Sequence, residues 1–343
     1  MALALALGIA GALAANALRL PLAWMLGPLI ACACGAMAGL HLEALPYGRE
    51  LGQAVVGLAI GVRFTPDVLA ATASLLPAMV VATIYLMAVT TLAALVMRPL
   101  GRVDRQTAFF ATAAAGVAEM AIVARERGGD PDAVSVVQAI RVAVVVTLVP
   151  ILVFAFGSDG GVGDRSPMAT GHPALVGGAL ALGLLAAVGL RRLPAFPNAW
   201  LFGPLLVGAL LSSAGGVAIA VSWPMLVVAQ IALGVALGCR FDRARLGRLP
   251  RVVASGLGIA LLLILAASLG ATVLSAVTGL SYATSFLALA PAGVTEMVLT
   301  ARVMHLDTVS VTAFHVVRIA VIATTILMSY GLFERLSRWI DGP

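Results

Sequence analysis

Two acidic residues lie in otherwise apolar segments, and the residues around them are nearly the same. Glu119 belongs to the hexapeptide AGVAEM, and Glu296 belongs to AGVTEM, 177 positions later. A charged side chain near the centre of a membrane helix costs roughly 2.5–3.5 kcal/mol on insertion scales. A membrane segment therefore retains a carboxylate when it has an internal partner or a function. The function that this residue type indicates is a proton or cation site.

A glycine lies three positions before each glutamate, at Gly116 and Gly293, and Pro291 precedes the second glycine. Glycine and proline mark places where one helix ends and another begins. If a helix begins after each glycine, Glu119 and Glu296 lie in its first turn, where free amide groups and the helix dipole favour a carboxylate. We therefore predict two broken helical segments. A structural anchor at the helix start is the alternative to a proton or cation site.

Two arginines follow at equivalent positions, about one third of the way into the next apolar segments. Arg141 and Arg318 lie too deep in these segments for easy snorkelling to the membrane surface. Gln138 and His315 precede them by three positions and share their helix face. An ion pair with a glutamate and an anion site are the two alternatives for the arginines. His315 could shuttle protons near neutral pH, and a packing role is its alternative.

These charges suggest one combined hypothesis. Glu119 and Glu296 meet near the bilayer midplane, each within reach of Arg141 or Arg318, because four buried charges of balanced sign cost least in a shared polar cavity. A proton that reaches a glutamate would release its arginine to hold an anionic solute.

The third apolar segment of each half carries a polar residue and two closely spaced glycines. Gln53 and Gln230 occupy equivalent positions, and each either forms an interhelical hydrogen bond or contacts a ligand. The GxxxG spacing predicts that both segments pack closely against a neighbouring helix, through Gly57, Gly61, Gly234 and Gly238.

Composition identifies a membrane protein that crosses the bilayer several times. The chain of 343 residues is 62% hydrophobic and only 10% charged, whereas soluble domains are about one quarter charged. All 21 basic residues are arginines, with no basic run beside aromatic residues, so direct nucleic-acid binding is not expected. The three cysteines and four histidines have no metal-site spacing, and we expect neither a metal nor another cofactor.

Self-comparison shows that the chain is duplicated. Three blocks recur in the same order at an offset of 176 or 177 residues, and each half contains six apolar segments. The expected organisation is a membrane repeat at residues 1–157, a polar linker at 158–172 and a second membrane repeat at 173–343. The blocks begin at Pro21, Gln53 and Ala115 in the first half, and at Pro197, Gln230 and Ala292 in the second.

Arginine placement favours five full spans in each half. If the fifth apolar segment of each half is a re-entrant hairpin, fifteen of nineteen loop arginines lie on one side of the membrane. Twelve full spans would divide them twelve to seven. The predicted fold is therefore an all-α polytopic membrane protein with two inverted repeats of about five transmembrane helices, each with a re-entrant or broken helix. Twelve spans, or a crossing helix unwound at its middle, are the alternatives.

The repeated PxxWxxGP, GxxxGxRF and GxxEM blocks resemble the membrane AbrB-like family of bacteria, which also carries the labels ammonia monooxygenase and AbrB family transcriptional regulator. The resemblance covers nearly the whole chain and implies a multi-pass protein of the bacterial inner membrane with a duplicated domain. The regulator label implies an indirect effect on gene expression. The first copy reads Ala114-Ala115-Gly116 where we expect a Pro-Gly-Gly-like turn, which argues against equal roles for the two halves.

The function expected from these features is secondary transport or export of a small solute, with the substrate site between the two broken helices at the bilayer midplane. A membrane sensor or regulatory partner is the second alternative. An enzyme is not expected, because no catalytic triad, phosphate loop or metal spacing is present. The expected partners are the lipid bilayer, a small-molecule solute and, as an open alternative, a second copy of the chain.

Overall fold

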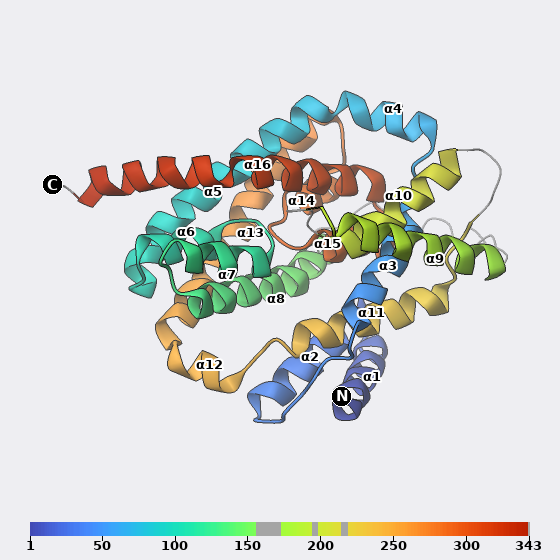
Figure 1. The fold of residues 1–343 in the computed structure, drawn as a ribbon, viewed down its shortest axis with the longest axis horizontal. Helices are drawn as coiled ribbons and strands as arrows, with labels where there is room; N and C mark the ends of the chain where they lie inside the picture. The colour runs from blue at the N-terminus through green and yellow to red at the C-terminus, as the bar shows by residue number, and fades with distance from the viewer. Residues whose placement is uncertain (156–172, 194–197, 214–218, 342–343) are drawn as a thin grey trace. The chain divides into compact units, whose positions relative to one another are not determined.

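The computed structural model describes residues 1–155, 173–193, 198–213 and 219–341 (Figure 1). All regular secondary structure in these ranges is helical. The polar linker predicted at 158–172 lies outside the described residues, as does Pro197 of the second PxxWxxGP block. The helical prediction is therefore confirmed for the described part of the chain.

The described part of each half contributes eight helices. The first half contains α1 (Ala2–Ala17), α2 (Ala23–Met37), α3 (Gly48–Gly61), α4 (Pro66–Ser74), α5 (Leu76–Gly101), α6 (Arg105–Thr112), α7 (Val117–Glu126) and α8 (Pro131–Ala155). The second contains α9 (Pro173–Leu190), α10 (Ala199–Ser213), α11 (Trp223–Gly238), α12 (Arg243–Arg248), α13 (Pro250–Thr278), α14 (Tyr282–Leu289), α15 (Val294–Val303) and α16 (Thr308–Asp341). The inverted orientation of one half relative to the other stays a prediction.

Six helices among the described residues are long and apolar enough to cross a membrane, and the pair α3–α4, bent by 93°, makes a seventh if it counts as one span. Helices α1, α2 and α10 are apolar but shorter. The end of α2 shows a cause of such shortening. Gly39 has a φ of 95°. Its N–H donates a hydrogen bond to Ala36 O, and the N–H of Leu40 donates one to Gly35 O. This is a Schellman motif, which ends α2 at Met37.

The chain forms two compact units, and neither coincides with a sequence repeat. Unit 1 comprises residues 1–74, 154–241 and 298–309, and unit 2 comprises residues 75–153, 242–297 and 310–343. Each unit therefore takes segments from both repeats. The repeats at 1–157 and 173–343 describe the duplication of the sequence, whereas the compact units are formed by contacts between the two copies.

Unit 1 is packed through glycines that let helix backbones approach each other. A Cβ atom at Gly57 would overlap the carbonyl oxygen of Leu201 in α10, and one at Gly61 would overlap that of Leu205. A backbone carbonyl cannot rotate away as a flexible side chain can. The GxxxG pair of α3 therefore forms a close helix–helix contact, as its spacing predicts.

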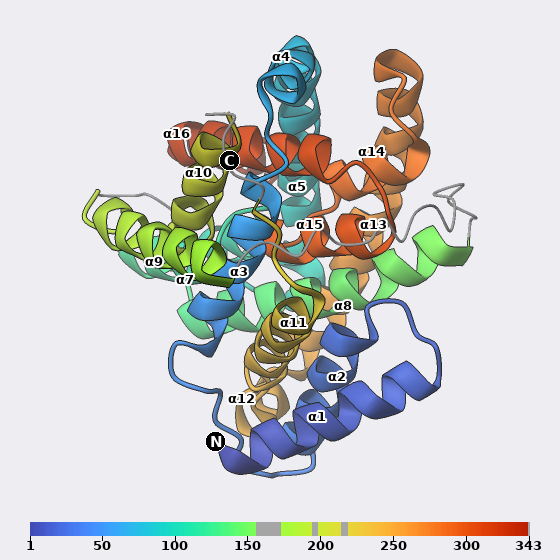
Figure 2. The ribbon, with the colours of Figure 1, turned by 90° about the vertical axis from the view of Figure 1, so that its right-hand side faces the viewer.

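The equivalent glycines of the second half make the equivalent contact within unit 1. A Cβ atom at Gly234 would overlap the carbonyl oxygen of Met25 in α2, and one at Gly238 would lie 2.6 Å from the carbonyl oxygen of Leu29. Helix α2 in turn lies alongside α1, as Figures 1 and 2 both show. The close packing predicted for both third segments is confirmed.

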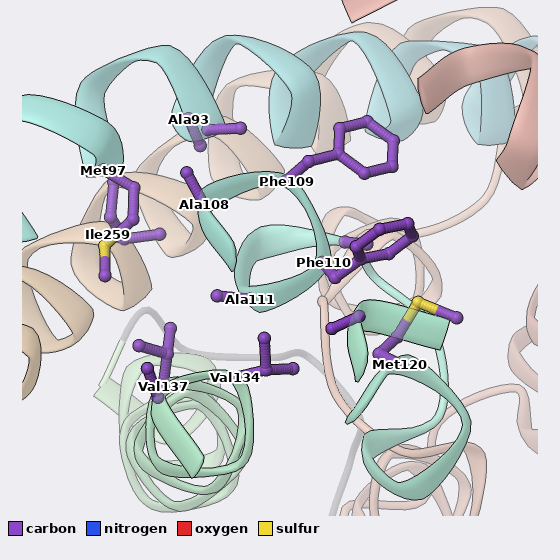
Figure 3. Packing of buried hydrophobic residues seen from close by; sticks show 14 of the residues in the cluster. Ala93, Met97, Ala108, Phe109, Phe110, Ala111, Met120, Val134, Val137 and Ile259 are labelled. Carbon is purple, nitrogen blue, oxygen red and sulfur yellow. The ribbon is translucent and has the colours of Figure 1, made fainter. Parts of the chain in front are cut away.

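Unit 2 has an apolar core around the short helix α6. Figure 3 shows Ala108 and Phe110 of α6 among side chains of neighbouring helices, including Met97 of α5, Val137 of α8 and Ile259 of α13. The ring of Phe110 also stacks on Tyr330 of α16, with 5.2 Å between the ring centroids. Helix α6 is too short to be stable by itself, so this burial is what holds it in place.

Candidate functional site

The candidate site consists of two helix breaks at equivalent positions. Helix α6 ends at Thr112 and α7 begins at Val117, while α14 ends at Leu289 and α15 begins at Val294. The residues after the first helices, Ala113 and Ala290, have ψ angles of 132° and 129°, which are extended rather than helical. Both breaks lie where the glycines predict them. Whether the segments are re-entrant or cross the membrane stays a prediction.

Arg141 of α8 caps the end of α6. Its Nη1 donates to the carbonyl oxygens of Thr112, at 3.1 Å, and Ala113, at 2.7 Å. Its Nη2 donates to Gln138 Oε1 at 2.7 Å, and the Gln138 amide donates to Ala113 O and to Phe110 O. The last carbonyl groups of a helix have no partner within it, and they form the negative end of its dipole. A buried guanidinium satisfies both requirements.

Arg318 of α16 makes the corresponding contacts at the second break. Its Nη1 donates to Ala290 O and its Nη2 to Ala292 O, both at 2.8 Å. Its Nη2 also lies 2.7 Å from His315 Nδ1, and His315 Nε2 lies 2.9 Å from Leu287 O. A guanidinium can only donate, so Nδ1 accepts and Nε2 carries the proton that bonds the carbonyl. These bonds describe a neutral histidine held in one tautomer.

Gln138 and His315 therefore have the same role, although they are different residues. Each donates to the carbonyl 28 positions before it, Phe110 O or Leu287 O, and each accepts from the arginine three positions after it. The contacts favour the packing role for His315 over the proton shuttle. In the sequence, Gln138 is recognisable only as a neighbour of Arg141, because the carbonyl group to which it donates belongs to a distant segment.

The two glutamates lie against the glycines that precede them. Gly116 is the N-cap residue of α7, and a Cβ atom there would overlap the Glu119 carboxylate. A Cβ atom at Gly293 would likewise overlap the carboxylate of Glu296. Glu119 is the third residue of α7, from which a carboxylate can fold back over the helix start, as in a capping box. Each glycine therefore leaves room for the carboxylate at the positive end of a helix.

The halves differ at this point. Glu119 is exposed in the single chain, whereas Glu296 is only 4% exposed. The unequal roles that the first break suggests, because it lacks proline, stay a prediction. The arginine bonds described above go to backbone carbonyls and to the side chains three residues earlier, so a direct Glu–Arg contact stays a prediction.

The two buried arginines belong to the same compact unit. Arg141 is 3% and Arg318 is 5% exposed, and both belong to unit 2. Each helix break therefore has a buried cation, and both cations belong to the same compact unit.

Gln53 and Gln230 belong to unit 1, and both side chains are buried, at 4% and 5% exposure. Their interhelical hydrogen bond, or the ligand contact that is its alternative, stays a prediction. Across the described residues, no group of three or more His, Cys, Asp or Glu side chains could hold a metal ion.

Comparison with known proteins places these features in a family. The family model described as "Transition state regulatory protein AbrB" matches residues 24–334, which include both breaks and both arginines. The chain belongs to the AbrB family. The match agrees with the resemblance carried by the three repeated blocks.

Two curated AbrB relatives align along most of their length. "Uncharacterized protein YhjN" of Bacillus subtilis (strain 168) is 28% identical over 359 aligned positions, covering 97% of this chain and 92% of the relative. "Putative regulator AbrB" of Escherichia coli (strain K12) is 25% identical over 315 positions, covering 90% of this chain and 89% of the relative. Neither name states a substrate.

Proposed function

We propose that this AbrB-family chain is a secondary transporter or exporter of a small solute. The observation that supports the proposal most directly is the pair of helix breaks in unit 2. At each break, a buried arginine donates hydrogen bonds to backbone carbonyl groups at the end of the first helix or just after it. Non-helical backbone at membrane depth is tolerated where protein covers it or where it lines a water-filled cavity. Broken helices at equivalent places in two repeats are typical of secondary transporters, whose substrates bind at such breaks.

The arrangement of polar groups also supports binding. Glu296, Arg141 and Arg318 are buried near helix ends, where backbone amides and carbonyls add further donors and acceptors. Ionisable residues inside membrane proteins mark substrate and ion pathways more often than they serve as packing. In this proposal the substrate contacts both breaks near the bilayer midplane. No enzymatic activity and no direct contact with nucleic acid are part of it.

The bacterial inner membrane is the proposed location. The residues that the structure describes include six long apolar helices, and helical spans with internally satisfied backbone groups are one of the two structures that cross bilayers. Both curated relatives are bacterial.

A membrane-embedded regulator is the second candidate, because one relative is named a regulator and the family description contains the word "regulatory". In that case a signalling solute would bind at the helix breaks and would not be transported across the membrane. Gene expression would change indirectly, through a cytosolic partner that reads the conformation of this chain.

Reconstitution distinguishes the two candidates. Purified protein in proteoliposomes is loaded with one of a panel of unlabelled amino acids, organic acids or amines, and uptake of the same labelled solute is followed. A transporter gives counterflow that depends on the internal solute. Folded protein without counterflow for any solute, together with a stable complex with a cytosolic regulator, would instead establish the second candidate.

A further inference from the structure

The arginines at the two breaks have hydrogen-bond donors left over. A guanidinium has five N–H groups. Arg141 makes three bonds through Nη1 and Nη2, and Arg318 also makes three. The Nε atoms of Arg141 and Arg318 are both buried, and neither has a partner among the described residues.

An unpartnered N–H is unusual at this depth of burial. Buried polar groups nearly always have a partner, and those without one require a specific explanation. Here the same atom is left without a partner in both copies of the duplicated sequence. The bonds of the Nη atoms also fix each guanidinium, so the two Nε–H groups are oriented before any ligand arrives.

The charges indicate what kind of ligand would fit. Two positively charged guanidinium groups are buried in unit 2. The carboxylates of Glu119 and Glu296 lie against Gly116 and Gly293, at the starts of α7 and α15. A neutral ligand such as water could accept hydrogen bonds from the two N–H groups but would bring no negative charge to the two buried cations. An anion with several acceptor oxygens would do both.

We infer that unit 2 binds a small oxyanion, a carboxylate or phosphate group, which accepts hydrogen bonds from Nε of Arg141 and of Arg318. The inference rests on the proposed function and names its substrate class: solutes that carry such a group, and not amines or neutral solutes. The arginines thus have two roles, since their Nη atoms hold the ends of α6 and α14 and their Nε atoms hold the substrate.

Binding can be measured without transport. Purified protein in detergent is titrated with sodium acetate, sodium succinate or sodium phosphate up to about 100 mM, with ionic strength kept constant by sodium chloride, and Tm is read from tryptophan fluorescence. Binding to the folded state raises Tm in a saturable way. We expect saturation with at least one oxyanion, and no saturable rise with acetamide, which has the shape of acetate without its charge.

Lysine variants test the residues. Arg141→Lys and Arg318→Lys keep the positive charge and a donor for the helix-end carbonyl, but they lose the planar fork. Each should weaken the apparent affinity at least tenfold. Arg302→Lys is the matched control, because Arg302 is partly buried and donates to Ala59 O in unit 1. Its apparent affinity should equal that of the wild type.

The wild-type titration alone can overturn the inference, even if a variant fails to fold. No saturable rise with any of the three oxyanions, or the same rise with chloride alone, would contradict it, as would unchanged affinity in folded Arg318→Lys protein. Counterflow of an amine without oxyanion binding would refute the inference about the substrate class, and the proposed transport function would still hold. Oxyanion binding without counterflow of any solute would support the site and contradict transport.

Discussion

At the scale of single residues, the two breaks show how different side chains perform one task. An amide in the first half and an imidazole in the second each combine a donor and an acceptor in one planar group, and each connects a distant carbonyl to the arginine one turn away. The requirement is therefore a donor and an acceptor in one side chain, and not a particular residue.

This equivalence predicts the effect of exchanging the residues. His315→Gln should cost less than about 1 kcal/mol of stability, because glutamine can make both bonds. His315→Leu leaves Leu287 O without its donor and one Arg318 donor without its acceptor, at about 1–3 kcal/mol for each buried group. Thermal and denaturant unfolding of the two variants measures the difference. Equal losses would show that the hydrogen bonds of His315 contribute little.

The glycines before the glutamates give a second prediction. Gly293→Ala forces the Glu296 carboxylate to move, and the cost should be about 1 kcal/mol because this side chain is flexible. In protein that already carries Glu296→Ala, the Gly293→Ala change should lower the free energy of unfolding by almost nothing further. A double-mutant cycle on unfolding free energies measures this coupling. Additive losses would mean that the glycine is needed for its backbone alone.

At the scale of helices, unit 1 depends on contacts between backbones. Gly57→Ala places a methyl group against the Leu201 carbonyl, and we expect a loss of about 1–3 kcal/mol, as for overpacking in a protein core. Gly178→Ala in α9 is the control, since a Cβ atom there meets nothing within 4 Å. The control should be neutral or slightly stabilising because alanine favours the helix. The free energy of unfolding is measured for both variants. Similar losses in the two would contradict the close contact of α3 with α10.

Sequence patterns predicted these helices better than they predicted what the helices contact. Glycine fixes the position of both breaks, and the GxxxG spacing predicts the close packing of α3 and α11, because both depend on local residue size. The partners of Arg141 and Arg318 are backbone carbonyls, which no residue type identifies. Bonding to them depends on how α8 packs against α6 and how α16 packs against α14.

At the scale of the whole molecule, the sequence repeats and the compact structural units divide the chain at different positions. The sequence repeats at constant offset, which predicted two membrane repeats joined by a linker, and each compact unit combines segments of both repeats. Contacts such as that of Gly57 with Leu201 join residues from different copies, and sequence similarity between copies carries no information about such pairings. Both helix breaks and their arginines belong to unit 2, and the glycine-packed helices belong to unit 1.

The orientation of the halves can be tested by labelling exposed positions. In a cysteine-free background, Arg102→Cys, Glu126→Cys and His305→Cys are treated with an impermeant thiol reagent from each side of the membrane. If the broken segments are re-entrant, positions 102 and 126 are labelled from one side and position 305 from the other. If the segments cross the membrane, 126 and 305 share a side and 102 is opposite. That second pattern would refute the inverted repeat of five spans.

The central claim is that the breaks held by Arg141 and Arg318 bind the solute that this chain transports. Its most direct test is counterflow of a labelled carboxylate into proteoliposomes that contain equal amounts of folded wild-type, Arg318→Lys or Arg302→Lys protein. The account predicts equal flux for wild type and Arg302→Lys, and an apparent KM at least tenfold higher for Arg318→Lys. Equal KM values for all three proteins, or no counterflow by the wild type, would contradict it.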